Sequence, residues 1–290
     1  MEDRLLHTMA LGLTPQIGPI TAKALVEHFG HASAVYRFLE SGFTKLEGFG
    51  AKLMSALSQG RSLALRRARK ELEMAKAKGI SIIGYWQEDF PWRLWACPDS
   101  PLFVYGLGKP SYNQARSVCI LGNNIKDAYN NRLVNYLLKG LRAYGVHVIC
   151  GNDSVWERSL QSTCTALEVP STVVLSESIY TDLKQTSEKT KTCYLSAHSH
   201  STKPVAHQSR IKSKIMAGLS DLCIVLEAGK FDPVMEVAEM ANDYHRDVAA
   251  FPGSIWRKQS YGTHFLIKTH QATLMSRVED LGYIMGWSPL

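Results

Sequence analysis

From residue 79 onward, short and almost entirely apolar runs alternate with stretches of helical spacing. The apolar runs cover residues 80–83, 118–122, 146–151, 172–175, 222–226 and 247–251, and the main helical stretches cover 129–144, 154–168, about 206–219 and 234–245. Strands that are apolar along their whole length are buried on both faces, as in parallel sheets with helical crossovers. The pattern predicts an α/β fold with an extended Rossmann-like parallel sheet, whose ligands bind where the strands' carboxyl ends meet.

Residues 1–78 have a different period and indicate a small all-α domain of the SAM or helix-hairpin-helix type. Glycine turns at 17–20 and 46–50 separate helical stretches, and we expect the last helix to break near 58–60. The backbone of such a turn can donate N–H groups to a DNA phosphate. A plain helical bundle with glycine turns is the simpler interpretation. We therefore expect two domains, 1–78 and 79–290.

Charge and cysteine usage narrow the class of protein. The 33 Lys and Arg residues exceed the 26 Asp and Glu residues, which gives a net charge of +7. This surplus favours polyanionic partners, although an otherwise ordinary basic protein fits it too. No CxxC pair occurs among the six cysteines, and no apolar stretch is long enough to span a bilayer. We expect a reduced, cytoplasmic protein without a membrane segment.

Two glycines follow apolar strands and precede helices, where backbone N–H groups and the helix dipole can bind an anion. These are Gly122 and Gly151. A simple strand-to-helix turn explains them equally well. Asn123 and Asn124 can donate hydrogen bonds there but bring no charge. Acidic or donor-free residues oppose a phosphate at the neighbouring positions, namely Asp153, Glu157, Asp232 and Pro233.

Cations in the stretch 206–219 can compensate for these weakened loops. Arg210 and Lys214 share a helix face, with Lys212 between them, and such a face binds phosphates without reading sequence. His264 and Lys268, one helical turn apart, are expected to flank the same edge. A solvated helix face is the alternative. For the basic stretch 61–78, a solvated helix with i,i+4 ion pairs is the favoured interpretation and a DNA contact the minority one.

The sequence offers little support for a catalytic or metal-binding site. No GxSxG elbow occurs, and His198 and His200 lack a third ligand at helical spacing. We expect no enzyme activity, no metal and no cofactor. Four tryptophans can stack on bases or pack in the fold, and we favour Trp156 as the stacking candidate. The others are Trp92, Trp95 and Trp256.

An ordered series of motifs resembles the DNA-processing protein A (DprA/Smf) family. It comprises residues 89–94, 97–106, 214–228, 245–254, 261–268 and 278–281, so that the similarity covers roughly residues 5–285. Departures are as informative. The family's G-S-R reads Gly122-Asn123-Asn124, its R-N-R reads Lys212-Ser213-Lys214, and Gln161 stands at a histidine position. We expect a divergent member without the C-terminal winged helix.

The resemblance implies sequence-independent binding of single-stranded DNA, self-association as a homodimer, and delivery of the strand to a RecA-type recombinase during natural transformation and DNA recombination. Two alternatives remain. The chain can be a degenerate paralogue that binds a partner but no DNA, or a nucleotide-derivative hydrolase related to phosphoribohydrolases, although residues 252–256 lack the glycine-rich turn of that family. Whether Arg210, Lys212 and Lys214 cluster with Gly122 at one edge of the sheet discriminates between DNA binding and the degenerate paralogue.

Overall fold

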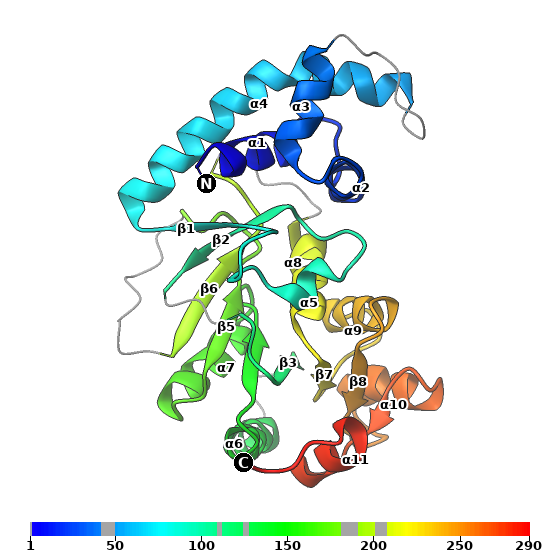
Figure 1. Cartoon of the computed structure of the whole chain (residues 1–290). Coiled ribbons are helices and arrows are strands. Elements are labelled where there is room, and N and C mark those ends of the chain that lie inside the picture. Colours follow the sequence, from blue (N-terminus) through cyan, green and yellow to red (C-terminus); the bar gives the residue numbers. More distant parts are fainter. Residues whose placement is uncertain (1, 42–49, 109–111, 124–127, 181–190, 201–207) are drawn as a thin grey trace. The chain divides into compact units, whose positions relative to one another are not determined.

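Two compact units make up the computed structural model, which describes residues 2–41, 50–108, 112–123, 128–180, 191–200 and 208–290 (Figure 1). The first unit comprises Met1–Leu107 with the short pieces Ser178–Tyr180 and Ala197–Lys203, and the rest of the chain forms the second. The boundary drawn from the sequence at 78/79 coincides with the end of a long helix. The compact unit continues to Leu107 because a strand pair follows that helix.

The first unit contains five helices and an antiparallel strand pair among its described residues. They are α1 (Glu2–Gly12), α2 (Pro19–Phe29), α3 (Ala32–Glu40), α4 (Ala51–Lys78), β1 (Ser81–Gly84), α5 (Trp92–Trp95) and β2 (Phe103–Leu107). The predicted break near 58–60 is wrong, since α4 runs unbroken through Gly60. A Cβ on Gly60 would lie 2.9 Å from Cγ2 of Thr14, so this glycine permits a close approach. The turn predicted at 46–50 falls almost entirely outside the described residues.

The second unit is built on seven parallel strands among its described residues, and the apolar runs predicted five of them, whereas the run at 80–83 forms the antiparallel strand β1 of the first unit. The seven strands are β3 (Ser117–Leu121), β4 (His147–Cys150), β5 (Ser171–Val174), β6 (Thr192–Ser196), β7 (Leu222–Val225), β8 (Asp247–Ala250) and β9 (Thr273–Leu274), in the spatial order β6-β5-β4-β3-β7-β8-β9. Strand β6 lies within a polar segment in which no apolar run predicted a strand. It forms because Cys193 and Leu195 are buried and the strand pairs with β5.

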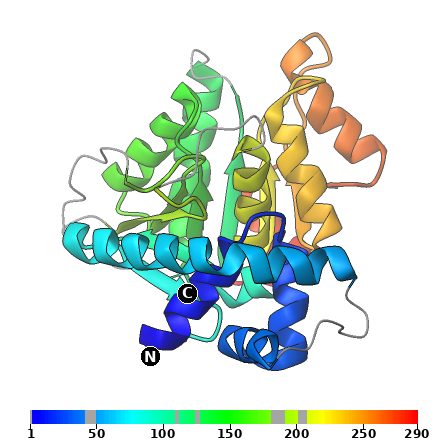
Figure 2. The same ribbon diagram turned by 90° about the horizontal axis from the view of Figure 1, so that it is seen from above.

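Helices cover both faces of this sheet. They are α6 (Ala128–Ala143), α7 (Val155–Ala166), α8 (Gln208–Leu219), α9 (Pro233–Asp243), α10 (Tyr261–Lys268) and α11 (Leu281–Met285). Right-handed crossovers place α6 and α7 on one face and α8 and α9 on the other (Figure 2). No helix in the described part of the chain is long and apolar enough to cross a membrane.

The strand order reverses at β3, and this reversal positions the candidate site. From β3 the chain continues to β4 on one side, whereas β7 pairs with β3 on the other side. The loops that leave neighbouring strands in opposite directions open a crevice at the carboxyl ends, which is where open α/β sheets bind ligands. The loops after β3, β4, β7 and β8 therefore frame the candidate functional site.

Candidate functional site

The rim formed by these four loops has two halves with opposite character. One half comprises the loops after β3 and β4 with the adjoining faces of α7 and α8. The other comprises the loops after β7 and β8 with the start of α10. We call the first the sealed half and the second the open half.

In the sealed half, Trp156 fills the space beside Gly122. The indole is 5% exposed, and a Cβ on Gly122 would lie 2.6 Å from Cζ2 of this ring. Gly122 therefore admits a packed tryptophan at this turn. The preference for Trp156 as a base-stacking residue is wrong, because a buried ring has no free face to offer.

Side chains at the N-terminus of α7 accept hydrogen bonds from backbone N–H groups of the same turn. Oε2 of Glu157 accepts hydrogen bonds from the N–H groups of Asp153 at 2.8 Å and Ser154 at 2.9 Å. In return the Ser154 hydroxyl accepts from the backbone N–H of Glu157, which completes a capping box. Two of the donors that could have faced a phosphate at this loop are thus held by a carboxylate of the chain itself.

Lys212 completes the closure from α8. Its Nζ lies 2.6 Å from Oδ2 of Asp153 and 2.9 Å from Oε1 of Glu157, and its side chain is buried. Burial lowers the pKa of this ammonium, but the two carboxylates outweigh burial and leave the pKa above its ordinary value. The ammonium is therefore charged and neutralised internally. A Cβ on Gly151 would lie 2.2 Å from Oε1 of Glu157, so this glycine makes room for the ion pair.

The other described residues that were predicted to bind DNA in this half interact with carboxylates of the protein or are partly buried. Nε of Arg210 lies 3.7 Å from Oε1 of Glu236, and Lys214 is half-buried on the same helix. Asn123 donates to the carboxylate of Asp232, whose other oxygen accepts from the N–H of Gly229 at 2.5 Å. Asn124 lies outside the described residues. The predicted cationic face is thus wrong for Lys212, which points inward between two acids.

The open half exposes large aromatic side chains beside cations. Phe231, in the loop after β7, and Trp256, in the loop after β8, are each 89% exposed, and Ile255 is 78% exposed. Ile255 and Trp256 line one groove together with other large side chains, and a contiguous exposed patch of this kind marks an interaction site. Nζ of Lys230 lies 5.2 Å from the ring centroid of Phe231 and 5.7 Å from that of Tyr261, so one ammonium forms cation–π contacts with both rings.

A groove of about 910 Å³ continues this surface along α10. Its walls include Trp256, Lys258, Tyr261, Phe265 and Lys268, and no carboxylate occurs among its lining residues, all of which the structure describes. The rings of Tyr261 and Phe265 are nearly parallel, with 9° between their planes and 6.4 Å between their centroids. Flat rings with neighbouring cations suit an anionic ligand that carries planar groups.

Buried contacts hold the open half in place. Nη2 of Arg257 binds Oε2 of buried Glu227 at 3.1 Å, which ties the loop after β8 to the loop after β7. A Cβ on Gly262 would lie 2.9 Å from the carbonyl oxygen of Ala228, so the start of α10 packs directly on that loop. Of the residues predicted on this side, His264 hydrogen-bonds the Gly253 carbonyl oxygen at 2.9 Å. The other, Lys268, is exposed on the groove wall.

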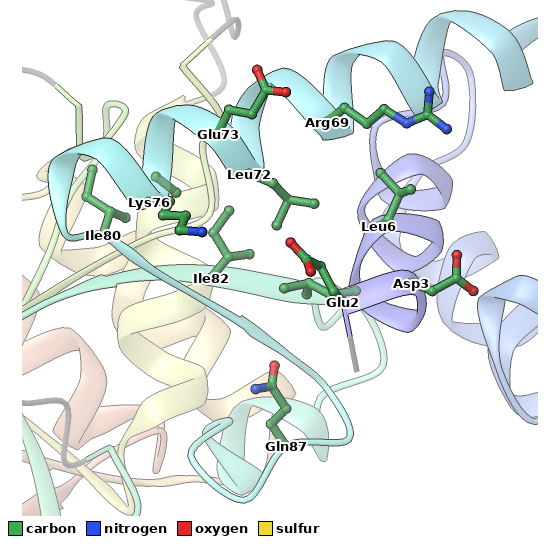
Figure 3. A pocket seen from close by; sticks show the side chains of 12 residues that line it. Glu2, Asp3, Leu6, Arg69, Leu72, Glu73, Lys76, Ile80, Ile82 and Gln87 are labelled. Carbon is green, nitrogen blue, oxygen red and sulfur yellow. The ribbon is translucent and has the colours of Figure 1, made fainter.

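The first unit holds a groove of about 870 Å³ between α1, α4 and β1 (Figure 3). Its floor is apolar, and Leu72 and Lys76 extend from α4 toward Ile82 and Glu2. The carboxylates of Glu2, Asp3 and Glu73 line it as well, which disfavours a polyanion. The described residues contain no group of three or more His, Cys, Asp or Glu side chains that could hold a metal ion.

The six cysteines are buried as free thiols. Burial raises the pKa of Cys164 to about 12 and that of Cys150 well above its ordinary value. A nucleophilic thiolate is disfavoured at both positions. Packing within the core, as the apolar runs around three of the cysteines indicate, accounts for their burial.

Comparison with known proteins places this architecture in context. The family model for the DNA recombination-mediator protein A matches residues 81–285. Protein Smf of Synechocystis is 24% identical over 286 residues, which cover 94% of this chain and 71% of the relative. A putative DNA processing protein DprA of Mycobacterium tuberculosis is 22% identical over 241 residues, which cover 76% of this chain and 61% of that protein.

Two solved structures share the fold. DNA processing protein A of Streptococcus pneumoniae aligns with a TM-score of 0.70 at 17% identity, over 95% of this chain and 96% of that one. DNA processing protein A of Helicobacter pylori, whose structure concerns its binding of single-stranded DNA, aligns with a TM-score of 0.60 at 16% identity, over 72% of this chain and 97% of that one.

Proposed function

Because this chain belongs to the DNA recombination-mediator protein A family, we propose that it binds single-stranded DNA without reading its sequence and passes the strand to a RecA-type recombinase. Its relatives support a DprA-like role in DNA processing. Binding and hand-off require no chemical turnover, and we propose that the protein is not an enzyme. Action as a homodimer and a location in the cytoplasm belong to the same proposal.

The observation that carries this proposal is the exposed pairing of aromatic rings with cations in the open half. Phe231 and Trp256 present free ring faces, and Lys230 lies against Phe231 and Tyr261. Unpaired bases have free faces that stack on such rings at roughly 1–3 kcal/mol per base, whatever the sequence. In a duplex those faces are already stacked. The surface therefore favours single strands over double strands.

A second candidate function is supported by the sealed half. Lys212 is neutralised by Asp153 and Glu157, so the loops after β3 and β4 offer no free cation from that residue. A paralogue that has lost DNA binding and serves as a partner-binding subunit would have this feature. It would not require the exposed rings and cations of the open half to contact DNA.

Fluorescence anisotropy with labelled single- and double-stranded oligonucleotides, measured across a salt series, separates the two functions. We expect preference for the single strand and an affinity that falls as salt rises. Replacing Trp256 by Ala should weaken binding roughly five- to tenfold, the lower part of the range for one lost stacking contact. The matched control is Tyr283→Ala, which removes another ring that is 86% exposed, on α11. Absence of single-strand binding at low salt would leave only the partner-binding function.

A further inference from the structure

The long helix α4 exposes a row of cations that the proposed function does not use. Arg66, Arg67, Arg69, Lys70 and Lys76 are all exposed, whereas Ala64, Ala68, Glu71 and Ala75 form the buried face of the helix. We call these five cations the α4 basic face. At 1.5 Å of rise per residue, Arg66 and Lys76 are about 15 Å apart along the helix axis.

Two members of the α4 basic face, Arg69 and Lys76, line the groove that Glu2, Asp3 and Glu73 also line, whereas Arg66, Arg67 and Lys70 lie outside that groove. The sequence favoured i,i+4 ion pairs in the stretch 61–78, but the partner of Arg61 is Glu40 on α3, which is not at that spacing. Within the described part of the chain, however, none of the five cations forms an ion pair or a hydrogen bond. Glu73 is the one exposed acid in residues 66–78, all of which the structure describes. Arg66, Arg67 and Lys70 therefore face water away from the acidic groove, and they are the members of the face that are best placed to meet an external anion.

Keeping like charges this close on a helix costs free energy at each i,i+4 pair such as Arg66 and Lys70. An external polyanion removes that cost. Because the guanidinium group binds phosphate oxygens through two parallel hydrogen bonds, three arginines among the five favour phosphate over carboxylate partners.

We infer that the α4 basic face is a second contact for the phosphate backbone of single-stranded nucleic acid, located in the first unit. The identity of the ligand rests on the proposed function, but the site is independent of the open half. An acidic protein is the other polyanion to consider. Protein interfaces are built around apolar and aromatic cores, whereas the described helix α4 exposes one large hydrophobic side chain, Leu63 at 38%, and no aromatic ring.

The contact is electrostatic and carries no base recognition. No aromatic residue occurs on α4, so this face positions a strand without stacking on it. Two binding surfaces on one chain raise the affinity for a strand that engages both, because the second contact forms intramolecularly. The α4 basic face therefore adds affinity and salt dependence, and the open half adds the preference for unpaired bases.

The test compares two variants of the full chain that lose the same charge. Arg66→Gln with Lys70→Gln removes two cations from the α4 basic face, and Arg132→Gln with Lys139→Gln removes two exposed cations from α6. Each protein is titrated into fluorescent oligothymidylate of 30 nucleotides between 50 and 300 mM salt. Each phosphate contact contributes about 0.7 to the slope of log affinity against log salt. We expect the α4 variant to lose about 1.4 from that slope and the α6 variant to keep the wild-type slope.

The outcomes separate this inference from the proposed function. If the wild type binds and both variants keep its slope, the α4 contact is overturned and the proposed function stands. If the wild type does not bind, the proposed function fails first. If poly-L-glutamate displaces the oligonucleotide from the wild type and binds the α4 variant less tightly, while the oligonucleotide slope is unchanged, α4 contacts an acidic protein instead. Circular dichroism melts of both variants should match the wild type, because all four side chains are exposed.

Discussion

The two halves of the rim lie at the same edge of one sheet, but their cations differ: the lysine of one half is buried and paired with acids, and that of the other lies over exposed rings. In the sealed half a buried lysine lies between two acids, and a carboxylate accepts from two backbone N–H groups of the loop after β4. In the open half a lysine lies over exposed rings, and the neighbouring groove is lined by cations and no acids among its described lining residues. A strand-end loop of this fold can thus be closed by internal pairing while its neighbour stays available.

Internal closure has a physical consequence for ligand binding. A phosphate that entered the loop after β4 would have to displace the Glu157 carboxylate from two N–H groups and from Lys212. The displaced acid would then need another partner in a largely buried place, which is costly. The sealed half therefore contributes to stability, and the open half is available for binding. The following predictions test that separation, beginning with the largest expected effect.

The largest effect is expected at Trp156, which packs beside Gly122 in the sealed half. Trp156→Ala should lower the free energy of unfolding by about 3–5 kcal/mol, because it removes a large buried ring and leaves a cavity. Urea denaturation measures the change. The matched control is Trp256→Ala in the open half, where the ring is exposed and the expected change is within about 0.5 kcal/mol. Equal destabilisation by both variants would remove the distinction between the halves.

A smaller loss of stability is expected at Lys212. Lys212→Met keeps much of the volume but leaves Asp153 and Glu157 facing each other without a cation. Breaking a buried pair costs about 3–5 kcal/mol. Since the Asp153 side chain is 38% exposed, we expect about 2–3 kcal/mol, measured by urea denaturation. Lys214→Met on the same helix is the control. An unchanged free energy of unfolding would show that the lysine does not hold the loop.

Lys230 in the open half should affect binding rather than stability. Lys230→Gln removes the ammonium that lies over Phe231 and Tyr261, and we expect single-strand affinity to fall about three- to fivefold at about 0.1 M salt, because one cation that can contact a phosphate is lost. Anisotropy measures the change, with the exposed Lys139→Gln as control. If both variants bind alike, Lys230 is only a solvated side chain.

The smallest effect is a pH dependence. The folded pKa of Lys212 lies above its ordinary value of 10.5. The stability from this group is therefore fully present below pH 10.5 and is lost as the pH rises through the folded pKa. The difference in unfolding free energy between the wild type and Lys212→Met should stay constant between about pH 6 and pH 9 and shrink above about pH 10.5. A difference that grew with alkaline pH would contradict the ion-pair account.

The sheet was predictable from the sequence because its strands are buried on both faces. Runs such as Val118–Leu121 and Leu222–Val225 have no polar residue to obscure them. Strand β6 was missed because its buried apolar residues, Cys193 and Leu195, alternate with Thr192, Tyr194 and Ser196 in a stretch rich in Ser, Thr and Lys. The two-residue strand β9 was missed because so short a segment has no period of its own.

The site was predictable in its position but not in its charge state. The sequence placed acids at Asp153 and Glu157, where they oppose a phosphate, and a cation at Lys212. It could not show that these groups meet, because their contact depends on how the first turn of α7 faces α8. The two tryptophans were ranked wrongly for a related reason. Trp156 lies in the first turn of α7 and packs inward over Gly122, whereas the Trp256 ring lies in a loop and is exposed to solvent.

The most direct measurement is a crossed comparison of one variant from each half, titrated with oligothymidylate at low and high salt. Phe231→Ala with Trp256→Ala should weaken single-strand binding at least about thirtyfold, since two stacking contacts of roughly 1–3 kcal/mol are lost, and should leave stability nearly unchanged. Lys212→Met should lower stability and leave the affinity and its salt slope at the wild-type values. The reverse result, with DNA binding lost through Lys212→Met and kept without the two rings, would contradict the assignment of the DNA contact to the open half.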